Sequence, residues 1–248
     1  MKSKYSEERM ILPGLCDAQA KLGVPDTFEL FMDLATVHAD VLGISARFPK
    51  MKGLFWITAK TRIRFYRRPG MLEKVVTETW PETPGRVKCN RSYRVLKNDQ
   101  VLIEGKTEWA LYDVTQKRIT SASSIYPEDL EWDEKPVLED GFARIEEKTS
   151  PENRIGTYTV SSVDIDLGGH MNNVAYVRMI ARLFSSAEWN ALQIEEAEAV
   201  YRAQCFEKEI LSVYREEDEK EMRFTVTKEN GDIAFQMRIV KGNHEEER

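Results

Sequence analysis

The order of predicted helices and strands repeats along this chain of 248 residues, and this repeat limits its possible folds more than any other feature. In the first half, an extended segment around residues 10–22 precedes a helical pattern over residues 24–43, where apolar side chains recur near the helical period. Asp26 or Thr27 is the expected N-terminal cap of this helix, and Gly43 its expected end. Four segments with strand character follow, at residues 54–66, 73–80, 86–96 and 100–114.

The second half shows the same order of elements. An extended segment at residues 155–166 precedes a helical pattern over residues 172–190. Four more strand patterns follow, at residues 197–206, 209–217, 220–230 and 232–241. The hairpin sequences SYRVLKNDQVLIEGKTEW and RFTVTKENGDIAFQMRIV, near the ends of the two halves, also resemble each other, each with a lysine-led polar turn. A repeat of about 140 residues indicates tandem domains and not a solenoid.

Each half therefore predicts one helix wrapped by a strongly curved antiparallel sheet, which is the hot-dog fold. Two such units in one chain predict an α+β protein with a tandem double hot-dog architecture. We expect an N-terminal domain over residues 1–125, a surface linker over residues 126–150 with two prolines and an acidic run, and a C-terminal domain over residues 151–248. Because one fold supports many functions, the function has to be argued from a site.

The composition is that of a folded protein without covalent cross-links. A hydrophobic content of 42% with 10% aromatic residues is enough for a packed core. The three cysteines are an odd number without Cys-x-x-Cys spacing, so we expect reduced thiols, with no disulfide framework and no cysteine-built zinc site. No apolar run is long enough to span a bilayer and the first residues lack the apolar core of a signal peptide, so the expected location is the cytoplasm, away from membranes.

The charge of the chain is unevenly distributed. A net charge of -6 disfavours nucleic acid as a general partner. From Lys60 to Arg94, however, ten lysines and arginines stand against three glutamates, whereas Glu128 to Lys148 holds nine acidic and three basic residues. The basic segment fits either a contact surface for an acidic partner or a solvated sheet face.

The segment DIDLGGHMNNVAY, residues 164–176, has the densest group of polar residues with catalytic potential. It leads into the helix of the second half, where an asparagine is a favoured cap and the free N–H groups of the first turn can stabilise an oxyanion. Asp166 can act as a general base or a nucleophile, and His170 can orient it or carry protons. The same residues also fit a non-catalytic loop of aspartate turns and glycine bends, and their spacing alone leaves both interpretations open.

The string DIDLGGHMNNVAYV resembles the DxDxNxHVNNxxY signature of the acyl-acyl carrier protein thioesterases of plants and bacteria. Three more segments agree with this resemblance: FELFMDLATVHADVLG is similar to the helix of the family's first domain, KTEWALYDVTQKRI to its tryptophan-containing strand, and VYRAQC to its EYRREC segment. The resemblance covers nearly the whole chain. It implies a double hot-dog thioesterase that needs no metal and no organic cofactor.

The resemblance also implies roles for individual residues. Asp166 takes the place of the catalytic aspartate, His170 that of the histidine, and Cys205 that of the cysteine in the EYRREC segment. Asn172 and Asn173 match the paired asparagines. These five residues and Gln204 make up the expected catalytic set.

Two positions depart from the family pattern. Gly168 stands where the family has a functional asparagine, and Gln204 where it has a catalytic glutamate. A glutamine can donate and accept hydrogen bonds but cannot take a proton near neutral pH, so Asp166 is expected to be the base almost alone. We expect Asp166 to assist attack of water on the thioester. A nucleophilic Cys205 is the weaker alternative, because a small thiol in a strand usually packs in the core and nothing nearby lowers its pKa.

The first domain carries no second catalytic motif. His38, within the predicted helix, is expected to be a core residue, and His244 lies in a polar tail. The resemblance implies that this domain binds the acyl chain, with Phe31, Met32, Phe55, Trp56 and Trp109 as candidate lining residues that could equally be core.

The same resemblance gives the basic segment a possible partner, because acyl carrier proteins are acidic. The cations concerned are Arg62, Arg64, Arg67, Arg68, Arg86, Lys88, Arg91 and Arg94.

The expected function is hydrolysis of fatty acyl-acyl carrier protein to a free fatty acid, in fatty acid biosynthesis. Hydrolysis of acyl-coenzyme A on the same fold is one alternative. A second alternative is a protein that binds acyl thioesters without hydrolysing them, because Gly168 and Gln204 both lack a functional side chain that the family has at these positions. A hydratase is less favoured, since the segment lacks a second carboxylate on the helix. Hot-dog sheets often pair edge to edge, so a homodimer is possible by analogy.

Overall fold

The computed structural model describes residues 1–132 and 135–242 of the chain. It divides the chain into two compact units, Met1–Gly141 and Phe142–Arg248. Within the described residues, no helix combines the length and the apolar character that a membrane span requires.

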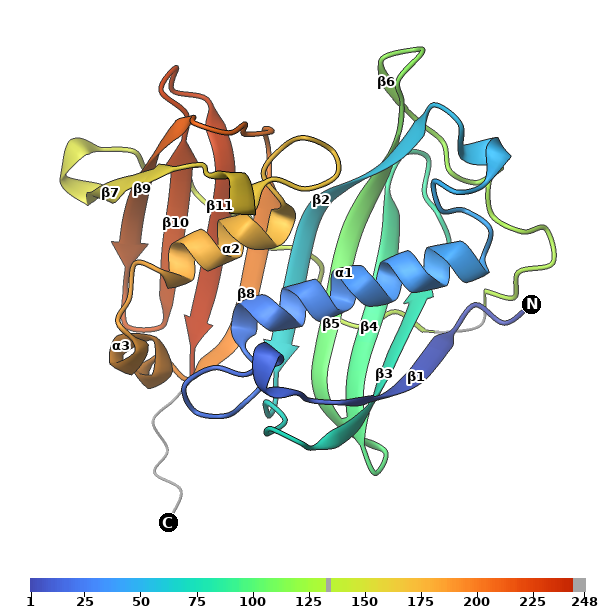
Figure 1. Ribbon diagram of the computed structural model, residues 1–248, viewed down its shortest axis with the longest axis horizontal. Helices are drawn as coiled ribbons and strands as arrows, with labels where there is room; N and C mark the ends of the chain where they lie inside the picture. Colours follow the sequence, from blue (N-terminus) through green and yellow to red (C-terminus); the bar gives the residue numbers. More distant parts are fainter. Residues whose placement is uncertain (133–134, 243–248) are drawn as a thin grey trace. The chain divides into compact units, whose positions relative to one another are not determined.

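Unit 1, Met1–Gly141, is an antiparallel sheet with one long helix across it (Figure 1). The strands lie in the order β1-β3-β4-β5-β2, and the short β6 pairs with β5. Their bounds are β1 Tyr5–Met10, β2 Leu54–Phe65, β3 Lys74–Pro81, β4 Cys89–Lys97, β5 Gln100–Asp113 and β6 Arg118–Thr120. Helix α1 is Val24–Val41, and two short 3-10 turns, Pro13–Leu15 and Pro49–Met51, lie before and after it. The helix and the four main strands expected from the sequence are thus confirmed.

The N-cap of helix α1 lies three to four residues before the predicted caps, Asp26 and Thr27. Gly23 is the N-cap, and Pro25 lies in the first turn, where its missing N–H costs nothing. Thr27 is buried instead of capping, and its hydroxyl donates back to the Gly23 carbonyl at 2.8 Å. The helix ends as predicted, since Gly43 follows with a φ of +70° that favours glycine.

The contact between α1 and the sheet depends on one ring and one glycine. Phe31 of α1 stacks on Tyr93 of β4, with ring centroids 4.5 Å apart. Gly105 of β5 lies beneath the same ring, because a Cβ atom there would stand 2.2 Å from Cε2 of Phe31. A side chain at position 105 would therefore hold the helix away from the sheet.

The surface linker expected over residues 126–150 is not a separate segment. Residues 122–130 pack into the core of unit 1, where Ile125, Tyr126 and Leu130 join a cluster that includes Leu111. Further along, Val137 and Leu138 bury against Trp80. The unit boundary falls after Gly141, and Ile145 beyond it is buried in unit 2. The prolines and acidic residues suggested a solvated linker, but the apolar residues between them decide its position.

Unit 2, Phe142–Arg248, repeats the plan with a shorter helix across its sheet (Figure 1). Its antiparallel strands lie in the order β8-β11-β10-β9-β7. Their bounds are β7 Arg154–Thr159, β8 Ile194–Tyr201, β9 Ile210–Glu217, β10 Glu221–Thr227 and β11 Ile233–Lys241. Helix α2 is Asn173–Ala181, α3 is Ser186–Ala191, and 3-10 turns occur at Pro151–Asn153 and Ser162–Asp164. Tyr176 of α2 stacks on Phe235 of β11 at 5.1 Å, which joins helix and sheet.

The single helix predicted over residues 172–190 is two helices. Ser185 starts α3 with a capping box, in which its hydroxyl accepts from the Glu188 amide and the Glu188 carboxylate accepts from the Ser185 amide. Phe184, just before this cap, packs on Trp189 and Phe224. The strand predicted over residues 197–206 is also shorter at its end, because β8 stops at Tyr201 and leaves Gln204 and Cys205 in the following loop.

Candidate active site

The motif of residues 164–176 folds into a tight turn ahead of α2. Ile165 and Met171 form an isolated antiparallel bridge that closes the turn. Inside it, the Asp166 amide donates to the His170 carbonyl at 3.0 Å, and the Gly169 amide donates to the Asp166 carbonyl at 3.0 Å. Gly169 has a φ of +75°, a conformation that glycine adopts without strain. The turn brings the side chains of Asp166 and His170 onto neighbouring positions.

The two aspartates of the motif have different environments. Asp164 is buried, and its carboxylate accepts from the Tyr158 hydroxyl and from the amide and hydroxyl of Ser161. Although burial alone would raise the pKa of Asp164, these hydrogen bonds outweigh it and lower the pKa. Asp166 is half-buried, and its Oδ1 atom accepts from the Gly168 amide at 2.7 Å. Within the described residues, the Oδ2 atom of Asp166 has no hydrogen-bond partner. Asp166, unlike Asp164, therefore offers a free carboxylate oxygen.

His170 lies beside Asp166 but not in hydrogen-bonding contact with it. Its Nδ1 atom is 3.8 Å from Asp166 Oδ1 and 3.4 Å from the Met171 carbonyl. A Cβ atom at Gly168 would stand 2.7 Å from His170 Nε2 and 3.0 Å from Asp166 Oδ1. The missing side chain at position 168 is therefore what allows the imidazole to lie this close to the carboxylate. Catalytic hydrogen bonds are often long in a free enzyme and shorten around a substrate.

The paired asparagines have different roles at the start of α2. Asn172 is the N-cap, and its side-chain oxygen accepts from the Val174 amide at 2.7 Å. That bond uses one of the N–H groups expected to stabilise an oxyanion. Within the described residues, the backbone amide and the side chain of Asn173 have no hydrogen-bond partner. The donors left for an oxyanion at this helix end belong to Asn173.

Three successive carbonyl groups of the loop after β8 accept hydrogen bonds, two of them from the turn and from α2. The Tyr176 hydroxyl donates to the Ala203 carbonyl at 3.2 Å, and the Met171 amide donates to the Cys205 carbonyl at 2.7 Å. Lys228 Nζ donates to the Gln204 carbonyl at 3.1 Å. These bonds bring Gln204 and Cys205 beside the turn of Asp166 and His170, and the Gln204 side chain is left exposed.

Cys205 has the environment of a structural thiol. It is fully buried, and burial raises the pKa of its thiol, although hydrogen bonding to Tyr176 and the Lys228 charge oppose the rise. A thiol with a raised pKa carries little of the nucleophilic thiolate form near neutral pH. Its other neighbour is Glu209, which pairs with Lys228 at 2.9 Å.

Glu209 is a carboxylate near the site that the sequence did not predict. Its Oε2 atom accepts from the Phe206 amide at 3.1 Å. Burial acts to raise the pKa of Glu209, but Lys228 and the Phe206 amide outweigh it, so the pKa is lowered. No spacing signal points to this residue, because it reaches Cys205 only through the fold of the loop after β8.

Unit 1 contains a cavity of about 160 Å³ between α1 and the sheet. Its apolar lining residues include Ala35, Ala39, Ile44, Trp56, Trp109 and Tyr126. Two of the five candidate lining residues, Trp56 and Trp109, line this cavity. Phe55 is 57% exposed and Phe31 is in the helix–sheet core, so neither lines it. His38 is a buried core histidine, as expected.

The basic segment does not form an open cationic surface. Arg62 and Arg91 are buried, against the expectation of a surface role. Arg67 pairs with Glu73, Arg68 with Asp17, Lys88 with Glu108 and Arg94 with Glu104, while Arg64 lies 3.4 Å from Asp140. Arg86 is exposed. Carboxylates on the neighbouring strand β5, Glu104 and Glu108, and in loops, Asp17, Glu73 and Asp140, neutralise most of this segment.

The described residues contain no grouping of three or more histidine, cysteine, aspartate or glutamate side chains that could hold a metal ion. His244 lies outside the described residues.

Two units of this kind, each with a helix across an antiparallel sheet, define a double hot-dog protein of the α+β class. Residues 2–128 match the family model of the acyl-ACP thioesterase N-terminal domain, and residues 147–242 match that of the acyl-ACP thioesterase C-terminal domain. The chain therefore belongs to the acyl-ACP thioesterase family.

Known proteins similar to this chain agree with the family. The oleoyl-acyl carrier protein thioesterase of Coriandrum sativum is 23% identical over 200 residues, and the palmitoyl-acyl carrier protein thioesterase of Cuphea hookeriana is 23% identical over 193 residues. These matches cover 71% and 72% of this chain but 52% and 46% of the plant proteins, which are chloroplastic. The chain thus spans about half the length of these relatives.

Solved structures show the same fold over nearly the whole chain. An acyl-ACP thioesterase from Bacteroides thetaiotaomicron has a TM-score of 0.86 at 20% identity, covering 97% of this chain and 98% of its own. The 12:0-ACP thioesterase from Umbellularia californica has a TM-score of 0.82 at 16% identity, covering 96% of each chain.

Proposed function

We propose that this protein hydrolyses the thioester of fatty acyl-acyl carrier protein and releases a free fatty acid. The observation that carries the proposal is the free Oδ2 atom of Asp166, in a turn that also holds His170 and the partner-free amide of Asn173. A base, a proton-carrying ring and an oxyanion donor are the groups that hydrolysis of a thioester needs. Membership of the family supports the choice of substrate.

In the proposed reaction, Asp166 takes a proton from a water molecule as the water oxygen bonds to the thioester carbonyl carbon. The carbonyl oxygen gains the negative charge, and the backbone amide of Asn173 stabilises it with a hydrogen bond. The carbon–sulfur bond then breaks, and the sulfur leaves with the proton returned from Asp166 through His170. The products are a carboxylic acid and the free thiol of the carrier.

Gln204 and Cys205 have supporting roles in this proposal. Gln204 orients the water by hydrogen bonding, since an amide cannot accept its proton near neutral pH. Cys205 holds the loop in place through its carbonyl bond to Met171 and its buried thiol. The apolar cavity of unit 1 binds the hydrocarbon of the acyl group, where each buried methylene contributes about 0.8 kcal/mol.

The partner and the setting belong to the same proposal. The substrate is delivered on an acidic carrier protein, and the released acid is a product of fatty acid biosynthesis. The cytoplasmic location expected from the sequence and the homodimer suggested by analogy with other hot-dog proteins stay predictions. Light scattering of the purified protein measures the oligomeric state directly.

The test compares the same acyl group on acyl carrier protein and on coenzyme A, over several chain lengths. Wild-type protein should release free fatty acid from the carrier-bound substrate at the higher kcat/KM, and Asp166→Ala should release none. A higher kcat/KM for coenzyme A would move the assignment to an acyl-coenzyme A thioesterase.

The departures at Gly168 and Gln204 favour a second candidate, a protein that binds acyl thioesters without hydrolysing them. Tight binding of an acyl thioester to the wild-type protein without release of acid would support it. That result would contradict the hydrolytic proposal.

A further inference from the structure

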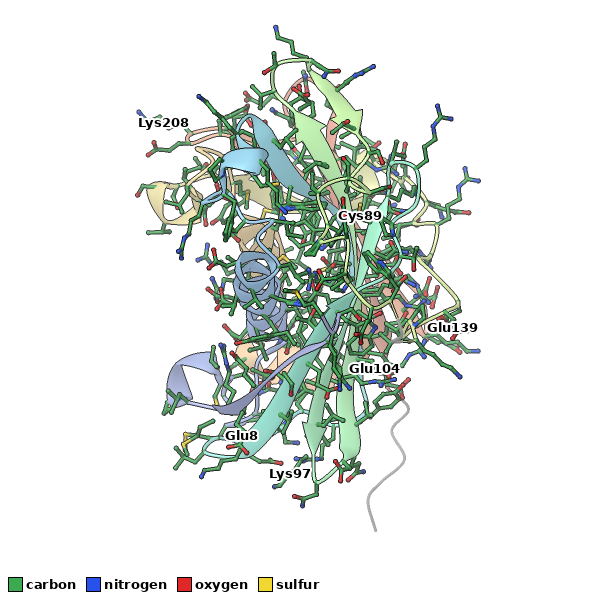
Figure 2. All side chains as sticks on the ribbon, turned by 90° about the vertical axis from the view of Figure 1, so that its right-hand side faces the viewer. Glu8, Cys89, Lys97, Glu104, Glu139 and Lys208 are labelled. Carbon is green, nitrogen blue, oxygen red and sulfur yellow. The ribbon has the colours of Figure 1, made fainter. Side chains whose placement is uncertain are left out.

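Arg91 is a buried cation on the inner face of β4 in unit 1. Its side chain contacts the core side of α1, where Nη1 donates to His38 Nδ1 at 2.8 Å, and it contacts β3, where Nη1 donates to Thr79 Oγ1 at 3.2 Å. The residue is only 6% exposed and lines the cavity of unit 1. Cys89, two residues before Arg91, also lines the cavity, and Figure 2 shows Cys89 and Lys97 at opposite ends of β4.

The titratable side chains around Arg91 are uncharged near neutral pH. Burial and the Arg91 charge lower the pKa of His38 to about 3, so the ring is neutral and accepts the hydrogen bond. Burial raises the pKa of Cys89 to about 11 and that of Tyr126 to about 12, so both keep their protons. Within the described residues, Arg91 forms no ion pair with a carboxylate.

A cation that is only 6% exposed loses most of its hydration, and buried charges in proteins are normally paired. Arg91 still has hydrogen-bonding capacity, because its guanidinium carries five N–H groups and the described residues accept only from Nη1. The remaining Nε and Nη2 groups have the fork geometry that binds a carboxylate at two points. The rest of the cavity lining is mainly apolar, from tryptophan, tyrosine, alanine and isoleucine side chains, with Thr36, Ser45 and Asn90 as its uncharged polar members.

We propose that the cavity of unit 1 binds an aliphatic carboxylate, with the carboxylate on Arg91 and the hydrocarbon against Trp56 and Trp109. A cavity of about 150 Å³ holds one benzene molecule, so the 160 Å³ here suits a chain of about six carbons without rearrangement. Two sources offer this chemistry: a free fatty acid, or an acyl group that carries a second carboxylate at its far end. Only the second source rests on the proposed function.

Calorimetric titration of hexanoate and hexan-1-ol into the full-length protein tests the binding without any need for turnover. Hexanoate should bind about tenfold more tightly than the alcohol, because a charged hydrogen-bonding pair distinguishes them. Arg91→Met should remove this preference. Arg94→Met is the matched control, since Arg94 lies on the same strand, pairs with Glu104 and does not line the cavity.

A second pair of variants keeps the test decisive if Arg91→Met fails to fold. Ala39→Phe fills the cavity from α1 and leaves Arg91 in place, so it should abolish hexanoate binding. Val37→Phe adds the same ring at an exposed position of the helix and should leave binding unchanged. Equal affinity for hexanoate and hexan-1-ol, or hexanoate binding that survives Ala39→Phe, would overturn the proposal.

The second source is tested by hydrolysis of thioesters of N-acetylcysteamine. If the far end of an acyl group occupies Arg91, the 5-carboxypentanoyl thioester should have a lower KM than the hexanoyl thioester in the wild type but not in Arg91→Met. With hexanoate binding present, a KM equal for both thioesters assigns the cavity to the free acid. Failure of hydrolysis with intact hexanoate binding contradicts the proposed function and not the cavity proposal.

Discussion

Asp164 and Asp166 stand two residues apart in the same motif, yet only one of them is available for chemistry. Asp164 is buried, and both oxygens of its carboxylate accept hydrogen bonds from Tyr158 and Ser161. Asp166 keeps one oxygen free beside His170. The family resemblance selected Asp166 from the sequence, and the hydrogen bonds give the physical reason for that choice.

Substitutions of the two glycines of the motif are expected to have different effects, one on activity and the other on stability. Gly168→Ala places a Cβ atom against His170 Nε2 and Asp166 Oδ1, so the imidazole must move. We expect kcat to fall by about tenfold to a hundredfold, since small misplacements of catalytic groups have such effects. Gly169→Ala meets open space but requires a φ of +75°, so it should instead lower the free energy of unfolding by about 1 kcal/mol.

Steady-state kinetics and urea unfolding of both glycine variants check this prediction. Equal losses of kcat in the two variants would show that backbone strain, and not the position of His170, controls activity.

His38 is expected to make the fold sensitive to acid. Its pKa is lowered from 6.5 to about 3 by burial and by the Arg91 charge, so the unfolded chain binds a proton that the folded chain excludes. The stability linked to neutral His38 is therefore complete above pH 6.5 and is lost as the pH falls towards 3. Between neutral pH and about pH 4.5, the wild type should lose about 2 to 3 kcal/mol more than His38→Gln.

His38→Gln keeps an oxygen that can accept from Arg91, so it removes the titration with little change in packing. Urea unfolding at the two pH values gives the comparison. Parallel losses in wild type and variant would mean that other groups cause the acid sensitivity.

At the scale of elements, the fit of α1 on β5 depends on Gly105. Gly105→Ala drives a methyl group into the Phe31 ring, and overpacking of this kind costs about 2 kcal/mol. Phe31→Leu removes Cε2, the ring atom nearest to that methyl group, and Cζ. The double variant should then be more stable than the sum of the single changes predicts, by about 1 kcal/mol in thermal unfolding. Additive losses would show that the ring and the glycine do not contact each other in solution.

Asn172, the N-cap of α2, stabilises the helix that begins at the proposed site. Asn172→Ala removes the acceptor for the Val174 amide and should cost about 1 kcal/mol in the free energy of unfolding. Asn172→Asp keeps the acceptor and serves as the control. Loss of stability in both variants alike would contradict a capping role.

Most elements could be predicted from the sequence because hydrophobic periodicity is a local signal. The misplaced boundaries have one local cause and one non-local cause. Ser185 ends the helical pattern through a capping box that competes with continuation of α2. The linker predicted over residues 126–150 rests on prolines and acidic residues, but the buried side chains of Tyr126, Leu130 and Val137 attach its first part to unit 1.

The candidate site was less predictable than the fold. The motif of residues 164–176 could be found because its residues are contiguous. The interior position of Arg91 depends on its contact with His38, 53 residues away in the chain, and Glu209 reaches Cys205 only through the conformation of the loop after β8, which no spacing encodes. The role of Asn173 as the remaining donor follows only once Asn172 is seen to cap Val174.

At the scale of the whole molecule, the proposed function divides the work between the units, with chemistry in unit 2 and chain binding in unit 1. Ala39→Phe tests this division, because it narrows the cavity of unit 1 without touching the turn of Asp166. We expect kcat/KM for a dodecanoyl substrate to fall by about tenfold or more, with little change for a butanoyl substrate, as about two to three buried methylenes are lost. A uniform loss for both chain lengths would contradict the division.

The central claim is that Asp166, and not Cys205, activates the group that attacks the thioester. The most direct test is kcat with acyl-acyl carrier protein for wild type, Asp166→Asn and Cys205→Ser, each shown to be folded by circular dichroism. We predict that Asp166→Asn lowers kcat by about a thousandfold, because the amide cannot take a proton, while Cys205→Ser retains most of the activity. Loss of activity in Cys205→Ser with activity retained in Asp166→Asn would contradict the account.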